Sequence, residues 1–408
     1  MIKTLNDLDY HNKRVLMRVD FNVPLDDKGN VRDGTRISAV KPTIDEVLGN
    51  GASIVMMSHL GGRKLKAMDT SASHTFPNVR SSLFSLAPVA EWIRNHWHIP
   101  IKFAPDCVGD EVKLIAQNLQ PGEILLLENL RLHPGEEDND VDFAAQLAQL
   151  GDVYVNDAFS VSHRPHASVK AVVNFFKGKA VAGRLLEKEL RYFSDAIENP
   201  DRPLIAILGG VKVSTKITLI KNLLNKVDHL LIGGAISYAF THINGGDIGD
   251  SFLEEDTLDE ARKIMESPLA YKMVLPVDSA NVTSLDSTDI HYSPSNKIPN
   301  GWKGIDIGNE TIEAYTDIIM NARTVIWNGP MGMFEKPAFA KGTYSIADAM
   351  AKAREKGIVT IAGGGDSAAA LTQFGLKDKM TYVSTGGGAS MELLEGKILP
   401  GVAALNDI

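Results

Sequence analysis

The feature that most constrains the fold is a recurring succession of a short apolar run, a turn and an amphipathic segment. Its fullest instance lies mid-chain, where the apolar run 204–208 is followed by Gly209-Gly210 and a helical pattern from Ile217. A run this short predicts a buried strand, and paired glycines permit backbone angles and close approaches that side chains forbid. In the helical pattern, one face carries apolar residues and lysines lie away from it: Ile217, Ile220, Leu223 and Leu224 against Lys212, Lys216 and Lys221.

A glycine turn at a helix start is suited to hold a phosphate. The free N–H groups and the positive end of the helix attract the anion, and Lys212 and Lys216 add charge. An ordinary turn whose lysines only solvate a helix would have the same sequence, so this stretch alone leaves both interpretations open.

The first half of the chain repeats the alternation. Apolar runs at 15–19, 53–57, 124–127 and 153–155 predict strands, and helical patterns such as 35–48 and 143–150 lie between them. Strands alternating with helices predict a parallel sheet covered on both faces, which is a doubly wound α/β fold.

Polar residues follow these strands at the point where each ends. Ligands of open α/β sheets bind at the carboxyl ends of strands, so a site is expected there. Several of the residues near this edge are of cationic types: Arg36, His59, Arg63, Arg131, His163, Arg164 and His166. They indicate a pocket for a small polyanion, although each alone could be a surface or salt-bridge residue. Asp20 could orient an arginine or accept from a substrate hydroxyl. The residues are Asp20, Asn22, Arg36, Ser58, His59, Arg63, Glu128, Arg131, Asn156, Asp157, His163, Arg164 and His166.

The second half contains three more glycine turns after apolar runs, at 230–234, 359–366 and 382–388. Four such turns indicate a sheet edge surfaced with backbone N–H groups for a phosphate chain, although tight packing would explain at least one of them. Asp366 follows three glycines and is a candidate ligand for Mg²⁺ on a nucleotide phosphate. Glu335 ends a Gly/Pro-rich loop after the strand that begins at Thr324 and could accept from a ribose hydroxyl.

Two motif tests narrow the nucleotide hypothesis. The sequence has no Gly-x-x-x-x-Gly-Lys-Ser/Thr, which excludes a P-loop protein. Residues 363–368 fit the loose dinucleotide pattern, but the next strand ends at Ser384-Thr385 without the acidic residue that would bind an NAD ribose. A nicotinamide-dependent oxidoreductase is therefore a weaker alternative.

Composition bounds the class of protein. A length of 408 residues predicts two or three domains, and a net charge of -9 speaks against nucleic-acid or anionic-membrane partners. The single cysteine, Cys107, cannot form an internal disulfide and is expected to be structural. No run of 18 apolar residues or signal peptide is present, so we expect a cytoplasmic protein. The histidines are not spaced as a zinc site, and no metal is expected at them.

The chain resembles the phosphoglycerate kinase family over essentially its full length. The matching segments occur in family order and at family-like spacing. They are Arg18-Val-Asp-Phe-Asn-Val-Pro24, Ser58-His-Leu-Gly61, Leu127-Glu-Asn-Leu-Arg131, Asp157-Ala-Phe159 with His163-Arg164, Leu208-Gly-Gly-Val-Lys-Val-Ser-Thr-Lys216, Trp327-Asn-Gly-Pro330, Gly363-Gly-Gly-Asp366 and Ser384-Thr-Gly-Gly-Gly-Ala-Ser390.

The resemblance implies two Rossmann-like domains and a reversible transfer, 1,3-bisphosphoglycerate + ADP = 3-phosphoglycerate + ATP, with Mg²⁺. It implies a phosphoglycerate domain at 1–183, a connecting helix and hinge at 184–200 that Gly183 precedes, a nucleotide domain at 201–390, and a segment 391–408 that returns to the first domain. A monomer is expected, with small molecules as its partners.

The resemblance also implies roles for residues at matching positions. Arg36, Lys212 and Lys216 would be catalytic, and Asp366 would hold the metal. The substrate would contact Asp20, Phe21, Asn22, Arg36, His59, Leu60, Gly61, Arg63, Arg131, His163 and Arg164. The nucleotide would contact Gly210, Lys216, Gly234, Glu335, Gly364, Gly365, Asp366, Ser367 and Gly387.

The chain departs from the family pattern at three places. His59-Leu-Gly is followed by Gly62-Arg63 rather than Arg-Pro, which displaces Arg63 by one residue. Ser160-Val-Ser162 stands where the family commonly has Gly-Thr-Ala, and the polar segment 64–85 is longer than usual. Every residue that a catalytically silent phosphometabolite-binding protein would lack is present, so only an assay separates that alternative.

Overall fold

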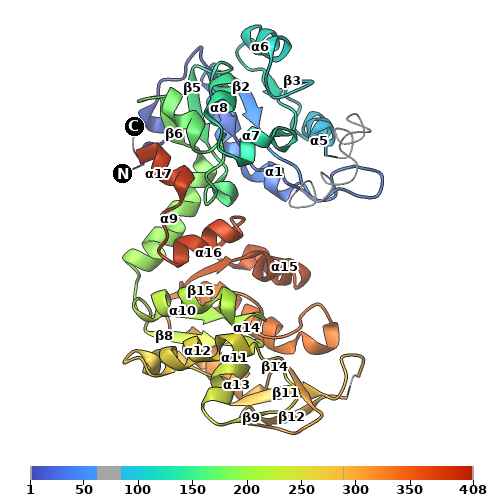
Figure 1. Ribbon diagram of the computed structural model, residues 1–408, viewed down its shortest axis with the longest axis vertical. Coiled ribbons are helices and arrows are strands. Elements are labelled where there is room, and N and C mark those ends of the chain that lie inside the picture. Colours follow the sequence, from blue (N-terminus) through green and yellow to red (C-terminus); the bar gives the residue numbers. More distant parts are fainter. Residues whose placement is uncertain (1, 62–83, 288, 407–408) are drawn as a thin grey trace. The chain divides into compact units, whose positions relative to one another are not determined.

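The computed structural model describes residues 2–61, 84–287 and 289–406, which form two compact units. The first unit comprises Met1–Leu190 with Ile398–Ile408, and the second comprises Arg191–Lys397. The division falls within α9 (Arg184–Glu198), the helix predicted at 184–200. Each unit is built on a six-stranded parallel sheet (Figure 1), so the prediction of two α/β domains is confirmed. No helix in the described part of the chain is long and apolar enough to cross a bilayer.

The sheet of the first unit has the strand order β3-β4-β2-β1-β5-β6, and all of its strands run parallel. The central strands are buried on both faces, as expected for a sheet that helices cover on both sides. The strands are β1 (Arg14–Arg18), β2 (Ser53–Met57), β3 (Ile101–Phe103), β4 (Ile124–Leu126), β5 (Val153–Asn156) and β6 (Ala180–Ala182).

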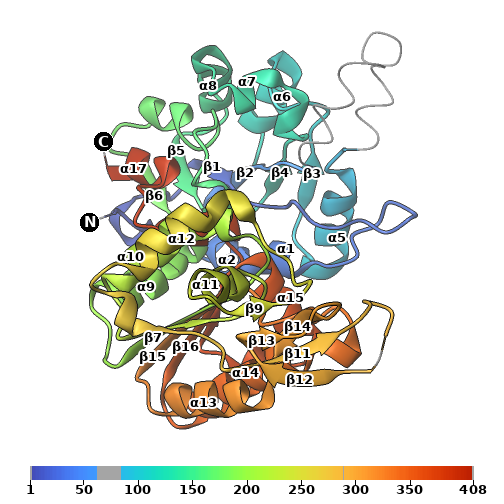
Figure 2. The ribbon, with the colours of Figure 1, turned by 60° about the horizontal axis from the view of Figure 1, so that its bottom comes forward.

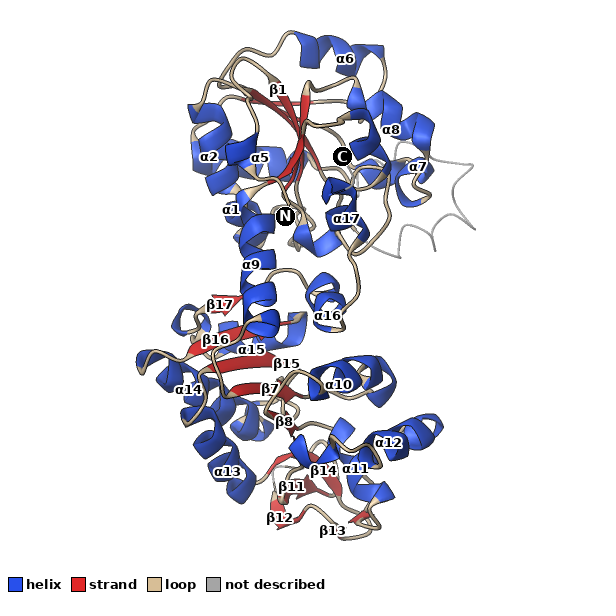
Figure 3. Ribbon diagram, turned by 90° about the vertical axis from the view of Figure 1, so that its left-hand side faces the viewer, coloured by secondary structure: helices blue, strands red, loops and turns tan. Residues whose placement is uncertain are grey.

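Helices cover this sheet on two sides, with α2 and α5 on one and α8 on the other (Figure 3). The apolar residues of α2 and α5, such as Ile44 and Ile93, share one core with Val15 and Met17 of β1. The helices of the unit are α1 (Thr35–Ala39), α2 (Lys41–Gly49), α5 (Ala87–Trp97), α6 (Asp110–Gln117), α7 (Pro134–Glu137), α8 (Val141–Ala148) and α17 (Pro400–Asn406).

The sheet of the second unit has the order β10-β8-β7-β15-β16-β17. Counted along the chain, these strands are first to sixth, and their order becomes 3-2-1-4-5-6, the order of dinucleotide-binding folds. The strands are β7 (Leu204–Leu208), β8 (His229–Ile232), β10 (Met273–Val274), β15 (Thr324–Asn328), β16 (Val359–Gly363) and β17 (Tyr382–Val383).

Helices α13 and α14 lie on one side of this sheet and α10 and α12 on the other (Figure 3). Tyr315 of α13 and Met350 of α14 pack in one core with Trp327 of β15. The helices are α10 (Ile217–Leu224), α11 (Ile236–Ile243), α12 (Leu258–Met265), α13 (Asn309–Met320), α14 (Lys341–Glu355), α15 (Gly365–Gln373) and α16 (Gly388–Leu394).

A small antiparallel sheet belongs to the same unit, with β11 (Asp278–Val282) between β12 (His291–Pro294) and β14 (Lys303–Ile307) (Figure 2). A two-stranded pair, β9 (Asp247–Ile248) with β13 (Lys297–Ile298), completes the described strands of this unit. None of these five strands was predicted, nor were β3, β6 and β10, because most of them lack a continuous apolar run.

The helix predicted at 35–48 is wrong in one respect, because it is two helices that meet at Val40. Pro42, in the first turn of α2, has no N–H to donate to a preceding turn, so the helix restarts there.

The start of α9 is tied to the first unit. Leu185 and Leu186 donate backbone hydrogen bonds of 2.8 and 3.0 Å to Asp157 Oδ1, and Arg184 N donates to Thr43 Oγ1 at 2.9 Å. A Cβ on Gly183 would lie 2.4 Å from the Asp157 carboxylate, so close packing explains the glycine there. Its role as a hinge element stays a prediction.

Candidate active site

The first candidate site lies where the strand order reverses. Strand β1 pairs with β2 on one side and with β5 on the other, so their carboxyl ends flank a switch point, where open α/β sheets bind ligands. Asp20 follows β1, His59 follows β2, and the turn that begins at Asp157 follows β5. The topology therefore brings together polar residues that are far apart in the sequence.

Asp20 is the centre of a hydrogen-bond network at this switch point. Its Oδ2 accepts from Arg36 Nη1 and from Ser160 Oγ, and its Oδ1 accepts from the Asn22 backbone N–H at 2.9 Å. The Asp20 side chain is 8% exposed, whereas that of Arg36 is 37% exposed. The buried carboxylate thus holds one end of a guanidinium that remains accessible to a ligand.

Backbone groups extend the network along the loops. Gly61 N donates to Asn22 Oδ1 at 2.9 Å, and Arg131 donates to the Gly61 carbonyl. Phe21 and Leu60, both predicted as site residues, have side chains packed in the core of the first unit. Their backbone N–H groups also have partners, because Phe21 N donates to Ser58 Oγ at 2.8 Å and Leu60 N donates to Asn129 Oδ1 at 3.2 Å.

His59 is a neutral residue here, which corrects its inclusion among the cations. It is buried, and its Nδ1 lies 3.1 Å from Arg18 Nη2. Since a guanidinium can only donate, Nδ1 is the acceptor and the proton lies on Nε2. Burial first, and then the positive charges of Arg18 and Arg131, hold the pKa of His59 well below its usual range.

A buried ion pair that was not predicted from the sequence lies next to His59. Arg18 and Glu136 are fully buried, with Arg18 Nη2 3.8 Å from Glu136 Oε1. Ser168 joins them, because its Oγ accepts from Arg18 Nε at 2.7 Å and donates to Glu136 Oε1 at 2.6 Å. Burial, followed by the charges of Arg18 and Arg131, lowers the pKa of nearby His166 to about 4. His166 is therefore also neutral.

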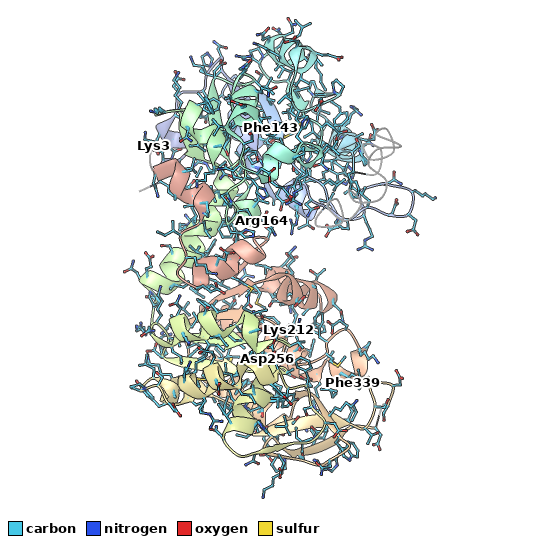
Figure 4. All side chains as sticks on the ribbon, in the orientation of Figure 1. Lys3, Phe143, Arg164, Lys212, Asp256 and Phe339 are labelled. Carbon is cyan, nitrogen blue, oxygen red and sulfur yellow. The ribbon has the colours of Figure 1, made fainter. Side chains whose placement is uncertain are left out.

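His163 and Arg164 lie on the segment that follows the turn after β5. Arg164, labelled in Figure 4, is exposed and donates from Nε to His163 Nε2 at 3.2 Å. Its charge is one of those that lower the pKa of Arg131, after burial and Arg18. Arg63 lies outside the described residues, as does most of the segment 64–85.

The second candidate site lies at the switch point of the other sheet, between β7 and β15. Gly209 N donates to the Asn328 carbonyl at 2.9 Å, and Gly210 N donates to the Pro330 carbonyl at 3.0 Å. A Cβ on Gly209 would lie 1.9 Å from the Pro330 oxygen, and one on Gly234 would lie 2.7 Å from Gly210 N. Close packing therefore requires these two glycines.

The other glycine turns differ, because around Gly365 and Gly387 a Cβ would meet no atom within 4 Å. These two residues lie at the starts of α15 and α16, where the first N–H groups have no partner within the helix. Gly364, with a φ of +95°, turns the chain from β16 into α15. These turns, rather than Gly209 and Gly234, have open backbone that an anion could approach.

Lys216 is buried, which corrects the expectation that it lies away from the apolar face. Its Nζ donates to Asn328 Oδ1, and burial lowers its pKa to about 8 against the opposing charges of Asp366 and Glu395. The 3-10 turn η5 (Val213–Thr215) precedes α10 and changes the helical phase. The buried set of α10 is consequently Leu219, Ile220, Leu223 and Leu224, without Ile217.

Lys212, labelled in Figure 4, precedes η5 and is exposed, as predicted. Asn328 was not assigned to the site, although it lies in the Trp327-Asn-Gly-Pro segment that carried the family resemblance. A polar residue directly after a buried strand is the signal that could have identified it.

A cavity of about 660 Å³ opens beside these turns, within the range of small-molecule sites. Four of its lining residues were predicted: Gly210, Gly234, Glu335 and Asp366. Its apolar lining was missed, because the residues come from separate loops, from α11 and from β14 without a shared pattern. These apolar residues are Val211, Ala235, Tyr238, Phe252, Leu285, Ile305, Pro330 and Met333.

Asp366 is the candidate metal ligand of this site. Its exposed carboxylate lies in the first turn of α15 and lines the cavity. One carboxylate beside a phosphate site suits Mg²⁺, which usually keeps several waters and binds substrate phosphates. Ser367 is buried, and its Oγ accepts from Gly329 N at 2.7 Å, so its hydroxyl supports the loop after β15.

A second group of metal-ligating types, Asp106, Cys107 and His133, lies in the first unit. Its members already have partners. Cys107 Sγ donates to the Glu128 carbonyl at 2.9 Å, and His133 Nε2 lies 2.5 Å from Asp106 Oδ1. Burial raises the pKa of the Cys107 thiol well above its usual range. The prediction of a structural cysteine is confirmed.

Three comparisons identify proteins similar to this chain. The family model described as phosphoglycerate kinase matches residues 5–397. The phosphoglycerate kinases of Chlorobaculum tepidum and Chlorobium limicola are 48% and 49% identical to it, each aligned over 99% of both chains. The structure of phosphoglycerate kinase from Coxiella burnetii is similar, with 37% identity, a TM-score of 0.86, and coverage of 100% of this chain and 99% of that chain. A second solved structure, from Pyrococcus horikoshii, has 30% identity, a TM-score of 0.81, and coverage of 100% and 98%.

Proposed function

The chain belongs to the phosphoglycerate kinase family, and we propose that its first unit binds 3-phosphoglycerate and its second unit binds ATP or ADP. The family's activity is the reversible transfer of a phosphoryl group between ATP and 3-phosphoglycerate, so the protein is a phosphotransferase of glycolysis. The nicotinamide-dependent alternative is not favoured, since every relative described above carries the name of the kinase.

One shared arrangement supports a site for a phosphorylated ligand in each unit. At the switch point of each sheet, a short polar side chain holds a long cationic one: Asp20 holds Arg36, and Asn328 holds Lys216. A phosphoryl transfer between two polyanions needs fixed positive charge beside both of them.

The phosphoglycerate would bind at the edge of the first sheet. Arg36, Arg131 and Arg164 would neutralise its phosphate and carboxylate, with Arg63 as a further candidate. Asn22, His59 and His163 would add hydrogen-bond partners, Asp20 would accept from the substrate hydroxyl, and Phe21, Leu60 and Gly61 would shape the loops around the substrate. Two buried neutral histidines make this site less positive than its residue types suggest.

The nucleotide would bind in the cavity of the second unit. Its apolar lining suits a purine ring, and Glu335 is available to accept from ribose hydroxyls. Open backbone at Gly365 and Gly387, with the adjoining backbone of Gly364, would receive the phosphates, and Gly210, Gly234 and Ser367 would shape the turns around them. Asp366 would hold Mg²⁺, which supplies charge neutralisation to the phosphates when bound.

The transfer requires no general base. The acceptor is a carboxylate, with an ordinary pKa of about 3.5, and it is ionised at neutral pH. Arg36, Lys212 and Lys216 would instead stabilise the charge on the transferring group and align it for in-line attack. The units would close over both substrates to exclude water, with a hinge near Gly183 and α9. Small-angle scattering with and without both ligands tests the closure, and unchanged dimensions would contradict it.

A coupled assay with ATP and 3-phosphoglycerate tests the proposed residues. Arg36→Ala and Lys216→Ala are each expected to lower kcat by at least about a hundredfold, as removal of a transition-state charge donor does. Arg32→Ala, an exposed arginine on the loop before α1, is the matched control and should retain wild-type kinetics. Full activity in both site variants would refute the assignment. No turnover in the wild type would instead indicate a catalytically silent phosphometabolite-binding protein.

We also propose that the protein is a monomer in the cytoplasm. Its partners would be small-molecule substrates, because the net charge of -9 disfavours nucleic acid and anionic lipid. Sedimentation equilibrium should give the mass of one chain.

A further inference from the structure

Ser160 lies at the switch point of the first sheet and contacts the centre of the proposed substrate site. It belongs to the 3-10 turn η3 (Phe159–Val161), which follows β5. Its Oγ donates to Asp20 Oδ2, the same oxygen that accepts from Arg36. The hydroxyl therefore bridges the loops that follow β1 and β5, two neighbouring strands.

The turn that carries Ser160 is fixed on the opposite side. Ala158 N donates to Asn156 Oδ1 at 3.0 Å, and Ser162 Oγ donates to the Ala158 carbonyl at 3.0 Å. Gly401 of α17 donates its N–H to the Ser162 carbonyl at 2.8 Å. Asn156, Ala158 and Ser162 are fully buried. The position of the Ser160 hydroxyl is thus set by a packed turn.

We propose that Ser160 is a positioning residue for 3-phosphoglycerate, acting through Asp20 and Arg36. This inference rests on the proposed function of the first unit. A carboxylate oxygen with two donors has less freedom to rotate than one with a single donor, and hydrogen bonds to a charged acceptor are the stronger ones. Ser160 therefore holds Asp20 in the orientation in which it accepts from the substrate and aligns Arg36. A glycine at this position would leave that oxygen with Arg36 alone.

The test compares Ser160→Ala and Ser160→Gly with the wild type in the coupled assay. Loss of one hydrogen bond is expected to raise KM for 3-phosphoglycerate about fivefold and to leave KM for ATP unchanged. Ser160→Thr keeps the hydroxyl and should restore a KM near that of the wild type. Thr4→Ala removes another hydroxyl that donates to an aspartate oxygen in the first unit, Asp7 Oδ2 at 3.1 Å, and should change neither KM.

Several outcomes would overturn the inference. An unchanged or lowered KM for 3-phosphoglycerate in both Ser160→Ala and Ser160→Gly would do so. An equal rise in both KM values, or an equal effect of Thr4→Ala, would identify a general structural effect instead. Arg36→Ala in the same assay distinguishes failure of the proposed substrate site from failure of the Ser160 inference. Full activity of Arg36→Ala refutes the substrate site itself. Impaired Arg36→Ala with unaffected Ser160 variants refutes only the role of Ser160.

Discussion

Lys216 donates a hydrogen bond from its Nζ to the Oδ1 of Asn328, across the switch point of the second sheet. The amide of Asn328 is itself fixed, because its Nδ2 donates to the Gly363 carbonyl at 2.9 Å. Met391 Sδ lies 3.8 Å from the same lysine nitrogen. A cation that would otherwise sample many rotamers is thus held in one place before any ligand arrives, which lowers the entropic cost of using it.

The depressed pKa of Lys216 predicts a pH dependence. Burial lowers this pKa to about 8, so the charged form is present below pH 8 and is lost as the pH rises through that value. Because kcat/KM reports the free enzyme, kcat/KM for ATP should fall with an apparent pKa near 8.

Lys216→Arg is the control for this profile, since arginine stays charged throughout. Its kcat/KM should be lower than that of the wild type but flat between about pH 7 and 9. A wild-type profile that stays flat to about pH 9.5 would contradict the depressed pKa.

The buried Arg18–Glu136 pair predicts a large effect on stability. Glu136→Gln would leave the fully buried Arg18 without a counter-charge, and removal of one partner of such a pair costs about 3 kcal/mol or more. Urea denaturation followed by circular dichroism measures the shift in midpoint. Asp138→Asn, an exposed acidic position two residues along, should shift it little. Equal midpoints for wild type and Glu136→Gln would show that the pair adds nothing.

The assignment of Asp366 predicts a changed metal requirement. Chelation by EDTA should abolish activity, and added Mg²⁺ should restore it. Asp366→Asn should need at least about tenfold more Mg²⁺ for half-maximal rate, because it loses the protein's charged ligand. Initial rates against Mg²⁺ concentration at fixed ATP give this value. Asp378→Asn, on the turn η9 (Lys377–Lys379), is the exposed control; identical Mg²⁺ curves for Asp366→Asn and wild type would exclude the role.

The sequence predicted the parts of this structure that depend on local periodicity. The central strands of both sheets and helices such as α8 and α9 lie within one or two residues of their predicted ranges. Strands as short as β9 and β10 have too few residues for their own pattern to predict them. The edges of the sheets, and the small sheet around β11, depend on neighbours that are distant in sequence.

The same distinction, between local pattern and contacts with distant residues, applies to the site residues. Asp20, Arg36 and Lys216 were identified because they follow strands or belong to matching segments. Ser160 and Asn328, which pair with Asp20 and Lys216, were not assigned, because pairing across a switch point appears only when the strand order is known. Burial also changed the chemistry: His59 has a cationic residue type and a neutral environment.

The four glycine turns provide a prediction that separates packing from binding. Gly209→Ala would place a methyl group 1.9 Å from the Pro330 oxygen, so the turns after β7 and β15 would have to move apart. A clash with backbone cannot be relieved by a side-chain rotation, and we expect a stability loss of about 2 kcal/mol or more, measured by urea denaturation.

Gly365→Ala, in contrast, meets no atom within 4 Å and has an ordinary helical backbone. It should keep wild-type stability while its methyl group covers backbone proposed to receive phosphate, so KM for ATP should rise about tenfold and KM for 3-phosphoglycerate should not change. If Gly365→Ala binds ATP as the wild type does, the open backbone at α15 is not part of the phosphate site. If Gly209→Ala is as stable as the wild type, close packing is not the reason for that glycine.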